Sequence, residues 1–385
     1  MEATKLEPLS AEDLPAAVAN VVAGATAAKM MVVRGMAPLR PAELLIAVYQ
    51  LSFDADASVK AAADGAPGGL PEKLLLGPLA ERLPPAVLHF FAVRLPPARR
   101  KAIETVLYNQ ATADETFVEL ARRLDESRLE IIFQNEVRLL RCPPLVEALY
   151  LNKKARMSSV SRALELCVRN NVRPEGIPGF DEFAAALLAD PNAVAPSVAD
   201  EAFTAALSQG DNVAVTEAPT DEGLAGLLGE EGDEDVDGGE QGQDLAAGAA
   251  FIKFDKLKIF EKIRLATVGN AYCRHVLIRD TNKIVAMAVV RSPSITDMEI
   301  VAAASNRGVC DDVIRYIANN RTYIKDYAVK LSLVNNPKCP LGNSLRLLSF
   351  LHPEDLRALS RSKNVPAALA TAAKKLMQTR SIRGG

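Results

Sequence analysis

The chain of 385 residues contains few groupings of side chains that could carry out a reaction. Adjacent carboxylates, which general acid–base catalysis can use, occur at Asp125-Glu126, Asp311-Asp312 and Glu354-Asp355. A catalytic carboxylate needs a buried setting that shifts its pKa, whereas carboxylates at helix starts are explained by the helix dipole or by solvation. We therefore predict no catalytic residue and no enzymatic activity.

Cysteine and histidine do not occur at the spacings of a metal or redox site. No two of the five cysteines lie within 20 positions of each other: Cys142, Cys167, Cys273, Cys310 and Cys339. The three histidines are equally isolated: His89, His275 and His352. We predict no metal and no cofactor, and we interpret the cysteines as reduced, small apolar residues of the helices.

One glycine cluster invites comparison with a phosphate-binding loop. The segment Gly65-Ala66-Pro67-Gly68-Gly69 lacks the Lys-Ser/Thr pair of a P-loop and follows no predicted strand. We interpret it as an ordinary loop.

Basic residues are concentrated in the C-terminal third of the chain. Residues 250–385 carry 23 Lys and Arg against 10 Asp and Glu, a net charge of +13, whereas the whole chain has a net charge of −3. The candidate basic interaction surface consists of Lys253, Lys256, Lys258, Lys262, Arg264, Arg274, Arg279, Lys283, Arg315, Arg321, Lys325 and Lys330. Such a surface suits phosphates or an acidic protein, and the density of cations alone does not choose between them.

The first of these cations alternate with Phe254, Leu257, Ile259, Phe260 and Ile263, which predicts an amphipathic helix. In one interpretation this helix closes the end of the domain and leaves its lysines in water. In the other, its basic face begins the interaction surface.

An acidic segment precedes the basic region. Residues 211–244 contain twelve Asp and Glu, no Lys or Arg, and frequent Gly, so we predict a disordered linker over 211–249. The linker either only solubilises the chain or masks the basic domain, to which it is joined at high effective concentration. Within it, Leu224, Leu227 and Leu228 fit one turn of a short interaction motif.

The elements that would position these residues are helices. Val285–Pro293 is echoed 44 residues later by Val329–Pro337, and Tyr108-Asn109 is echoed 43 residues later by Leu151-Asn152. A fixed period predicts a stack of helical repeats. The composition agrees, with 5% aromatic residues and no Trp.

Capping signals mark the ends of these helices. Thr296–Glu299 and Thr112–Glu115 match the capping box, and Pro340 and Pro366 precede apolar helical runs. The doublets Asn319-Asn320 and Asn335-Asn336 are expected to end helices in the left-handed conformation, which Asn tolerates. Further helices are expected from His352-Pro353 and from Pro366 to about Arg380.

The order of an aliphatic helix, Asn-Pro or Ser-Pro, a Thr or Pro cap and a Leu-rich helix resembles the variant leucine-rich repeat. Ala288–Ala302 and Ser332–Leu347 carry this pattern. The chain is also similar to HEAT-type α-solenoids and to uncharacterised bacterial proteins built from them. The resemblance implies a right-handed stack of helices with a concave binding face, and it implies no catalytic residue.

We predict an all-α protein of two HEAT-like solenoids in four segments: an N-terminal segment 1–39, a degenerate repeat domain 40–210, the linker 211–249 and a basic repeat domain 250–385. Residues 16–33 are interrupted by Asn20, Gly24 and Lys29 and follow acidic residues, so we expect neither a signal peptide nor a membrane partner. The expected location is the cytoplasm.

We expect the protein to act as a scaffold or adaptor that binds a macromolecule, most simply a protein. Nucleic-acid binding by residues 250–385 is the main alternative. A repair-type enzyme on a HEAT-like scaffold is a third, and the absence of Trp argues against the aromatic pocket it would need.

Overall fold

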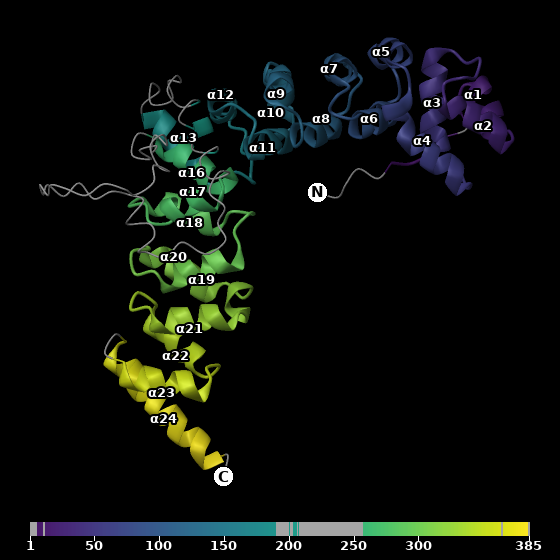
Figure 1. Cartoon of the computed structure of the whole chain (residues 1–385). Coiled ribbons are helices and arrows are strands. Elements are labelled where there is room, and N and C mark those ends of the chain that lie inside the picture. The colour runs from purple at the N-terminus through teal and green to yellow at the C-terminus, as the bar shows by residue number, and fades with distance from the viewer. Residues whose placement is uncertain are drawn as a thin grey trace, which may run out of the picture. The chain divides into compact units, whose positions relative to one another are not determined.

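The computed structural model describes residues 6–10, 12–189, 200, 203–205, 207, 257–362 and 365–383. These residues form helices and connecting loops and include no strand, which confirms the all-α class (Figure 1). The predicted linker 211–249 lies outside the described residues. The chain divides into two compact units, Met1–Ile177 and Pro178–Gly385, which we describe separately.

Unit 1 is a double row of short helices. It contains α1 (Ala16–Val22), α2 (Thr26–Val33), α3 (Pro41–Leu51), α4 (Ala57–Gly69), α5 (Glu72–Ala80), α6 (Pro85–Arg94), α7 (Arg100–Tyr108), α8 (Asp114–Ala121), α9 (Glu126–Phe133), α10 (Glu136–Arg141), α11 (Pro143–Leu151) and α12 (Met157–Arg169). Each helix packs mainly on the next but one in the chain: α3, α5 and α7 line one layer, and α4, α6, α8 and α11 line the other. The large side chains between the layers, such as Tyr49, Phe90 and Phe117, are buried.

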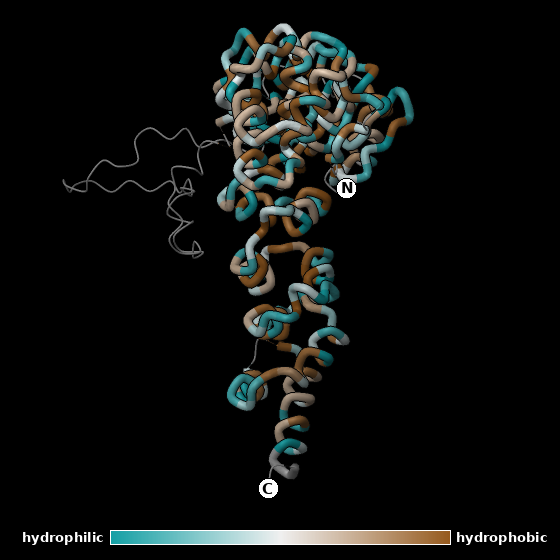
Figure 2. Tube along the Cα trace, turned by 90° about the vertical axis from the view of Figure 1, so that its right-hand side faces the viewer, coloured by the Kyte–Doolittle hydropathy of each residue, from teal (hydrophilic) through white to brown (hydrophobic). Residues whose placement is uncertain are grey.

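Unit 2 is built in the same way. It contains α13 (Phe180–Ala189), α16 (Ile259–Val268), α17 (Ala271–Leu277), α18 (Lys283–Val290), α19 (Asp297–Ser305), α20 (Asp311–Asn319), the 3₁₀ helix η3 (Tyr323–Lys325), α21 (Tyr327–Asn335), α22 (Leu341–Leu348), α23 (Pro353–Arg361) and α24 (Ala367–Arg383). We call α16, α18, α20, α22 and α24 layer A, and α17, α19, α21 and α23 layer B. Apolar and polar stretches alternate along the helices of this unit, as a two-layer packing requires (Figure 2).

The spacing of the layers corrects the predicted repeat length. Helices α4, α6, α8 and α11 begin at Ala57, Pro85, Asp114 and Pro143, which are 28 or 29 residues apart. In unit 2, helices of one layer begin 24 to 30 residues apart. The echoes at 43 and 44 residues therefore span about one and a half repeats, and they pair helices of opposite layers: α7 with α11, and α18 with α21.

Buried asparagines join neighbouring helices of one layer at their C-terminal ends. The amide of Asn336, which follows α21, donates hydrogen bonds to the carbonyl oxygens of Ala304 (2.8 Å) and Asn306 (3.2 Å) at the end of α19. Its side-chain oxygen accepts a hydrogen bond from the Lys338 N–H at 2.9 Å. Two asparagines of unit 1 repeat all three bonds: Asn109 after α7 and Asn152 after α11.

This network replaces the left-handed conformation expected for the asparagine doublets. Helices α20 and α21 do end at these doublets, but Asn320 and Asn336 have φ values of −81° and −85° and extended backbone. The expected conformation is therefore wrong. Asparagine suits position 336 because its side-chain N–H groups can bond unpaired carbonyl oxygens at the end of the neighbouring helix. At the same time its side-chain oxygen accepts a bond from the backbone N–H two residues later.

Arginine side chains bond other carbonyl oxygens at or beyond helix ends. Arg99 donates to the Gly68 oxygen at 2.7 Å, Arg346 to the Ala318 oxygen at 3.0 Å, and Arg380 to the Leu351 oxygen at 2.8 Å. In each case donor and acceptor are 28 to 31 residues apart, which is one repeat. Many of the charged residues of this chain thus serve helix-to-helix contacts.

The unit boundaries differ from the predicted domains. Residues 1–39 are not a separate segment, because α1 and α2 pack on α3 and α4. Unit 1 ends at Ile177, well before residue 210. Helix α13 belongs to unit 2, where the Phe183 ring meets the Phe260 ring edge-on with the ring centroids 5.2 Å apart. Directly before α13, Gly179 has a positive φ of +74°, a conformation that favours glycine. A side chain is also excluded at this position, because a Cβ would lie 2.8 Å from Ile263 Cδ1.

Local signals succeed in part. The Thr296–Glu299 capping box is present at α19, and the helices expected after His352 and Pro366 form. The box at Thr112–Glu115 does not form, because the Thr112 hydroxyl is buried and donates to the Val106 oxygen at 2.8 Å. The segment Gly65–Gly69 is the end of α4 rather than a loop, and the burial of Ala66 and Pro67 stabilises the helix there.

Candidate interaction surfaces

Three of the predicted basic surface residues are buried or half-buried and use their charges in packing. Arg264 is fully buried with its guanidinium 4.6 Å from the centre of the Phe203 ring. Arg274 is also buried; it donates to Glu299 Oε1 at 2.9 Å and to the Gly269 oxygen at 2.7 Å, and so joins α17 to α19. Lys262 is half-buried and forms an ion pair of 2.8 Å with Asp280. Arg264 and Arg274 are therefore no part of an exposed surface, because their charges are used in packing.

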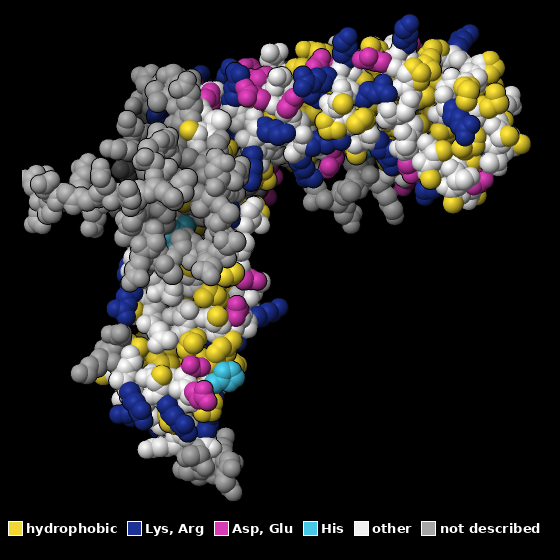
Figure 3. Space-filling model, viewed as in Figure 1, with side chains coloured by type: hydrophobic (Ala, Val, Ile, Leu, Met, Phe, Trp, Pro, Cys, Tyr) yellow, Lys and Arg dark blue, Asp and Glu magenta, His cyan; other side chains and the backbone are white. Residues whose placement is uncertain are grey.

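The other predicted cations do not form one stripe. Lys253 and Lys256 lie outside the described residues. Lys258 and Lys283 are exposed where α16 and α18 begin, whereas Arg321 and Lys325 are exposed beyond the end of α20, at the opposite edge of the layers. On the face seen in Figure 3, Lys and Arg side chains of unit 2 lie at separate places.

The last three predicted cations have close partners in the fold. Arg315 is exposed and lies 3.5 Å from Asp312, and Arg279 and Lys330 are half-buried. The Lys330 ammonium donates to the Lys325 carbonyl oxygen at 3.1 Å and lies 5.8 Å from the centre of the Phe350 ring. None of the three extends a continuous basic track.

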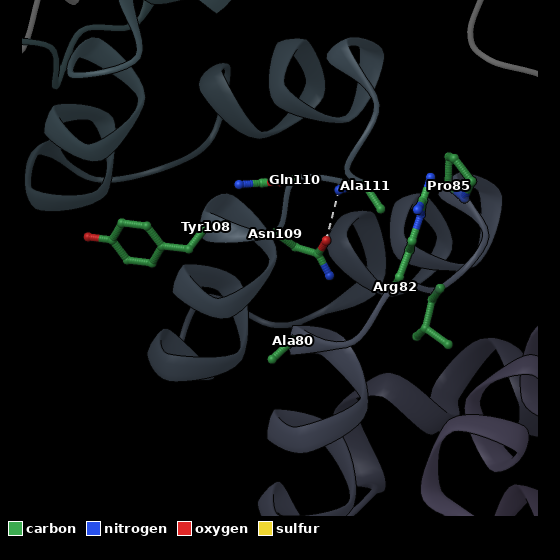
Figure 4. A pocket seen from close by; sticks show the side chains of 8 residues that line it. Ala80, Arg82, Pro85, Tyr108, Asn109, Gln110 and Ala111 are labelled. Carbon is green, nitrogen blue, oxygen red and sulfur yellow. Dashed lines mark hydrogen bonds between the residues drawn. The ribbon is translucent and has the colours of Figure 1, made fainter.

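Unit 1 contains a surface hollow of about 650 Å³ between the ends of α5 and α7 and the start of α6. It is lined by Ala80, Arg82, Leu83, Pro85, Tyr108, Asn109, Gln110 and Ala111. Figure 4 shows Asn109 at its centre, with Tyr108 and Gln110 pointing to one side and Arg82 and Pro85 on the other. The Asn109 amide is already engaged with Leu79 and Glu81, so only the exposed Arg82, Tyr108 and Gln110 offer polar groups to a ligand.

The described residues show no grouping that suits catalysis. The paired carboxylates fall at the starts of α9, α20 and α23. Within the described ranges, no three His, Cys, Asp or Glu side chains converge as a metal site would require. His89 is buried with Nδ1 3.0 Å from Thr116 Oγ1; burial lowers its pKa, outweighing the opposing effect of Glu119 and Glu115, so the ring is neutral at neutral pH.

Hydrophobic helices of membrane-spanning length are absent from the described part of the chain.

A surface that the sequence reasoning missed lies on layer B. We call it the α19/α21 face. Its side chains occupy positions i, i+3, i+4 and i+7 of two adjacent helices, and all eight are exposed or half-buried: Met298, Val301, Ala302 and Ser305 of α19, and Ala328, Leu331, Ser332 and Asn335 of α21. The opposite faces of the two helices are buried, through residues such as Ile300 and Leu333.

Exposed helix faces usually carry charged residues, and this face carries none. Met298 is 67% exposed. In the sequence, Val301 and Ala302 merge with the buried Ile300 and Ala303 into one apolar run, so their outward direction is visible only once the packing is known. The signal in the sequence is that positions i, i+3, i+4 and i+7 carry no charged residue, both in α19 and in α21.

Charged residues border the α19/α21 face along both edges. Layer B helices run in the same direction, since Asn336 joins the ends of α21 and α19, and Tyr327 at the start of α21 hydrogen-bonds Asp355 at the start of α23. Their starts carry acidic residues, Asp297, Asp326 and Glu354, with the exposed Lys325 directly before Asp326. Their ends are followed or closed by the exposed Arg307 and Arg361 and by the half-buried Lys338, whose ammonium also donates to the Val309 carbonyl oxygen at 2.8 Å.

On the view in Figure 3, hydrophobic side chains gather over the α21–α23 part of unit 2 with acidic side chains beside them. Figure 3 shows one side only, and the eight residues of the face come from their exposure and helical spacing. The arrangement provides an uncharged floor between two rows of opposite charge.

Comparison with known proteins adds no family: no family model, no curated protein and no solved structure matches the chain. The resemblance to variant leucine-rich and HEAT-type repeats therefore stays a prediction, and the surfaces of the two units carry the functional argument.

Proposed function

We propose that this protein is a non-enzymatic scaffold or adaptor that binds a partner protein on the exposed helices of unit 2. The observation that carries the proposal is the α19/α21 face, where four outward positions on each of two neighbouring helices are all uncharged. Contiguous uncharged surface rimmed by polar residues is typical of protein interaction sites. No reactive grouping among the described residues competes with this reading.

The repeat spacing supports a variant leucine-rich type of solenoid over a HEAT type. HEAT repeats are roughly 40–47 residues long and leucine-rich repeats roughly 20–29. Helices of one layer in this chain begin 24 to 31 residues apart. Such stacks present extended surfaces for macromolecular partners.

A cytoplasmic location belongs to the same proposal. All five cysteines are free, and Cys167, Cys273 and Cys339 are buried singly in the helices. Burial raises the pKa of the Cys167 thiol to about 11, which keeps it protonated and inert. Unpaired thiols in this number suit a reducing compartment.

Nucleic-acid binding by unit 2 has less support. It would need cations aligned along a phosphate backbone, whereas Arg264 and Arg274 are buried and the exposed cations lie on both edges of the layers.

The proposal is tested by comparing two charge insertions in the full chain. Leu331→Glu places a carboxylate on the α19/α21 face, and Leu345→Glu places one on α22, where Leu345 is 40% exposed in layer A. We expect Leu331→Glu to remove proteins that the wild-type chain captures from lysate of its own host, and Leu345→Glu to retain them.

Capture that is equal for both variants and the wild type would remove the α19/α21 face from the proposal. Capture that disappears after nuclease treatment would favour the nucleic-acid alternative. Circular dichroism of each variant verifies that the helices are intact.

A further inference from the structure

We propose that the α19/α21 face binds an amphipathic α-helix of the partner, with basic residues along one flank of its apolar stripe and acidic residues along the other. This inference rests on the proposed function and names the chemistry of the partner.

The floor of the face favours a helix over an extended segment. Backbone N–H and C=O groups of α19 and α21 are paired inside their own helices, so the floor offers only side chains. An extended peptide would have to leave its own backbone groups unpaired against this uncharged surface. A helix satisfies its backbone internally and buries only its side chains, which removes that cost.

The width of the face matches one helix. The helices α19 and α21 have nine residues each, and at 1.5 Å per residue the acidic and basic rows at their two ends are about 13 Å apart. A helix with its side chains is about 10–12 Å in diameter. A partner helix lying across α19 and α21, along the stacking direction, would fit between the rows.

The two rows determine the charges of the partner helix. Asp297, Asp326 and Glu354 lie along one border, and Arg307, Lys338 and Arg361 lie along the other. A helix whose two flanks carry opposite charge meets a complementary row on each side. A helix with flanks of one sign meets repulsion along one border.

The test uses labelled synthetic peptides of about 20 residues, the length of a 30 Å helix. All share one Leu/Ala stripe; the mixed peptide has Lys on one flank and Glu on the other, and two controls have Lys or Glu on both. A fourth peptide is the mixed one with two central residues replaced by Pro, which prevents a continuous helix. Binding to the full chain is measured by fluorescence anisotropy at about 50 mM and about 500 mM salt.

We expect the mixed peptide to bind at least about tenfold more tightly than the Pro peptide, and about threefold or more tightly than either control at low salt. The advantage over the controls should shrink at high salt, because the borders are exposed. Leu331→Glu should weaken the mixed peptide about tenfold or more, and Leu345→Glu less than about twofold.

A second face variant keeps the test valid should Leu331→Glu unfold the chain. Ala328 is exposed at the start of α21, so Ala328→Arg adds bulk and charge to the floor at a position outside the core. It should weaken the mixed peptide in the same way.

Four outcomes would overturn the inference. Equal binding of the Pro peptide would mean an extended occupant, and stronger binding of the all-Glu peptide would mean an acidic ligand, including nucleic acid. Self-association of the full chain that Leu331→Glu abolishes would mean that a second copy covers the face. If no peptide binds while host proteins are still captured in a Leu331-dependent way, the inference fails and the proposed function stands.

Discussion

At the scale of single residues, the chain uses side chains that look functional to hold its helices together. Arg274 and Lys262 were candidates for a binding surface because of their charge, yet they pair with Glu299 and Asp280. Those partners are 25 and 18 residues away, so only the packing of one layer brings each pair together. The number of charged residues in a chain of packed helices therefore indicates a binding surface only after the residues that pair between helices are left out.

The asparagine after each helix can be tested against its neighbour. Asn336→Ala removes two hydrogen bonds to the end of α19 and leaves buried carbonyls unpaired, so we expect a loss of about 2–3 kcal/mol in the free energy of unfolding. Asn335→Ala removes only an exposed bond to the Leu331 oxygen and should cost less than about 0.5 kcal/mol. Urea unfolding followed by circular dichroism measures both, and equal losses would contradict the role given to Asn336.

Buried His89 predicts how stability depends on pH. Burial lowers its pKa in the folded chain, so below the unfolded pKa of about 6.5 the unfolded chain binds more protons than the folded one. Stability is thus complete above that value and falls as the pH drops through it. We expect His89→Gln, which keeps a hydrogen-bonding group near Thr116, to reduce the fall in urea midpoint between about pH 7 and pH 5.

A fall of the same size in His89→Gln would contradict this account of the histidine. The wild type and the variant are compared at each pH, so carboxylates that titrate elsewhere cancel between them.

At the scale of elements, helices and their ends could be predicted from sequence, and their arrangement in layers could not. The Thr296–Glu299 box and the proline before α22 are local signals, and they place helix starts to within a residue. The repeat length is not local. Asn109 and Asn152 make equivalent hydrogen bonds to the preceding helix of their own layer, and the two layers are opposite, so the spacing of 43 residues corresponds to one and a half repeats.

Two deletions distinguish these repeat lengths. Removing residues 85–113 takes out α6 and α7, one helix from each layer, and joins α5 to α8 in the correct alternation. Removing residues 109–151, the length of the sequence echo, takes out α8 to α11 and joins α7 directly to α12. Because α12 packs on α9 and α10, and α9 packs on α7, this junction places two helices of one layer in succession. We expect the first deletion to retain a cooperative urea transition and the second to lose it or aggregate.

Cooperative unfolding of the chain lacking 109–151, together with loss of structure on removal of 85–113, would restore the repeat of 43 or 44 residues. Circular dichroism and sedimentation distinguish folded, unfolded and aggregated chains.

The α19/α21 face could not be read from sequence for a related reason. Val301 and Ala302 are as apolar as the buried Ile300 and Ala303, and helical spacing alone does not show which side of the helix faces the core. The fact that no charged residue occupies the outward positions becomes informative only after the buried side is known. The predicted basic surface fails for the opposite reason, because Arg264 and Arg274 are charged yet buried.

At the scale of the whole molecule, a nearly neutral chain keeps its positive charge in the part that begins at residue 250. Part of this charge, at Arg307, Lys338 and Arg361, follows or closes the helices of layer B, and because these helices are parallel the three residues lie in a row. The same arrangement gives layer B one acidic and one basic border. The surplus charge thus becomes a property of the α19/α21 face, and the proposed partner is defined by both borders together.

Binding at the α19/α21 face is tested most directly by hydrogen exchange of the full chain with and without the mixed peptide. We expect slower exchange in α19 and α21 and at the residues bordering them, with unit 1 unchanged. Protection confined to the hollow between α5, α6 and α7 would show that the α19/α21 face is not the binding surface.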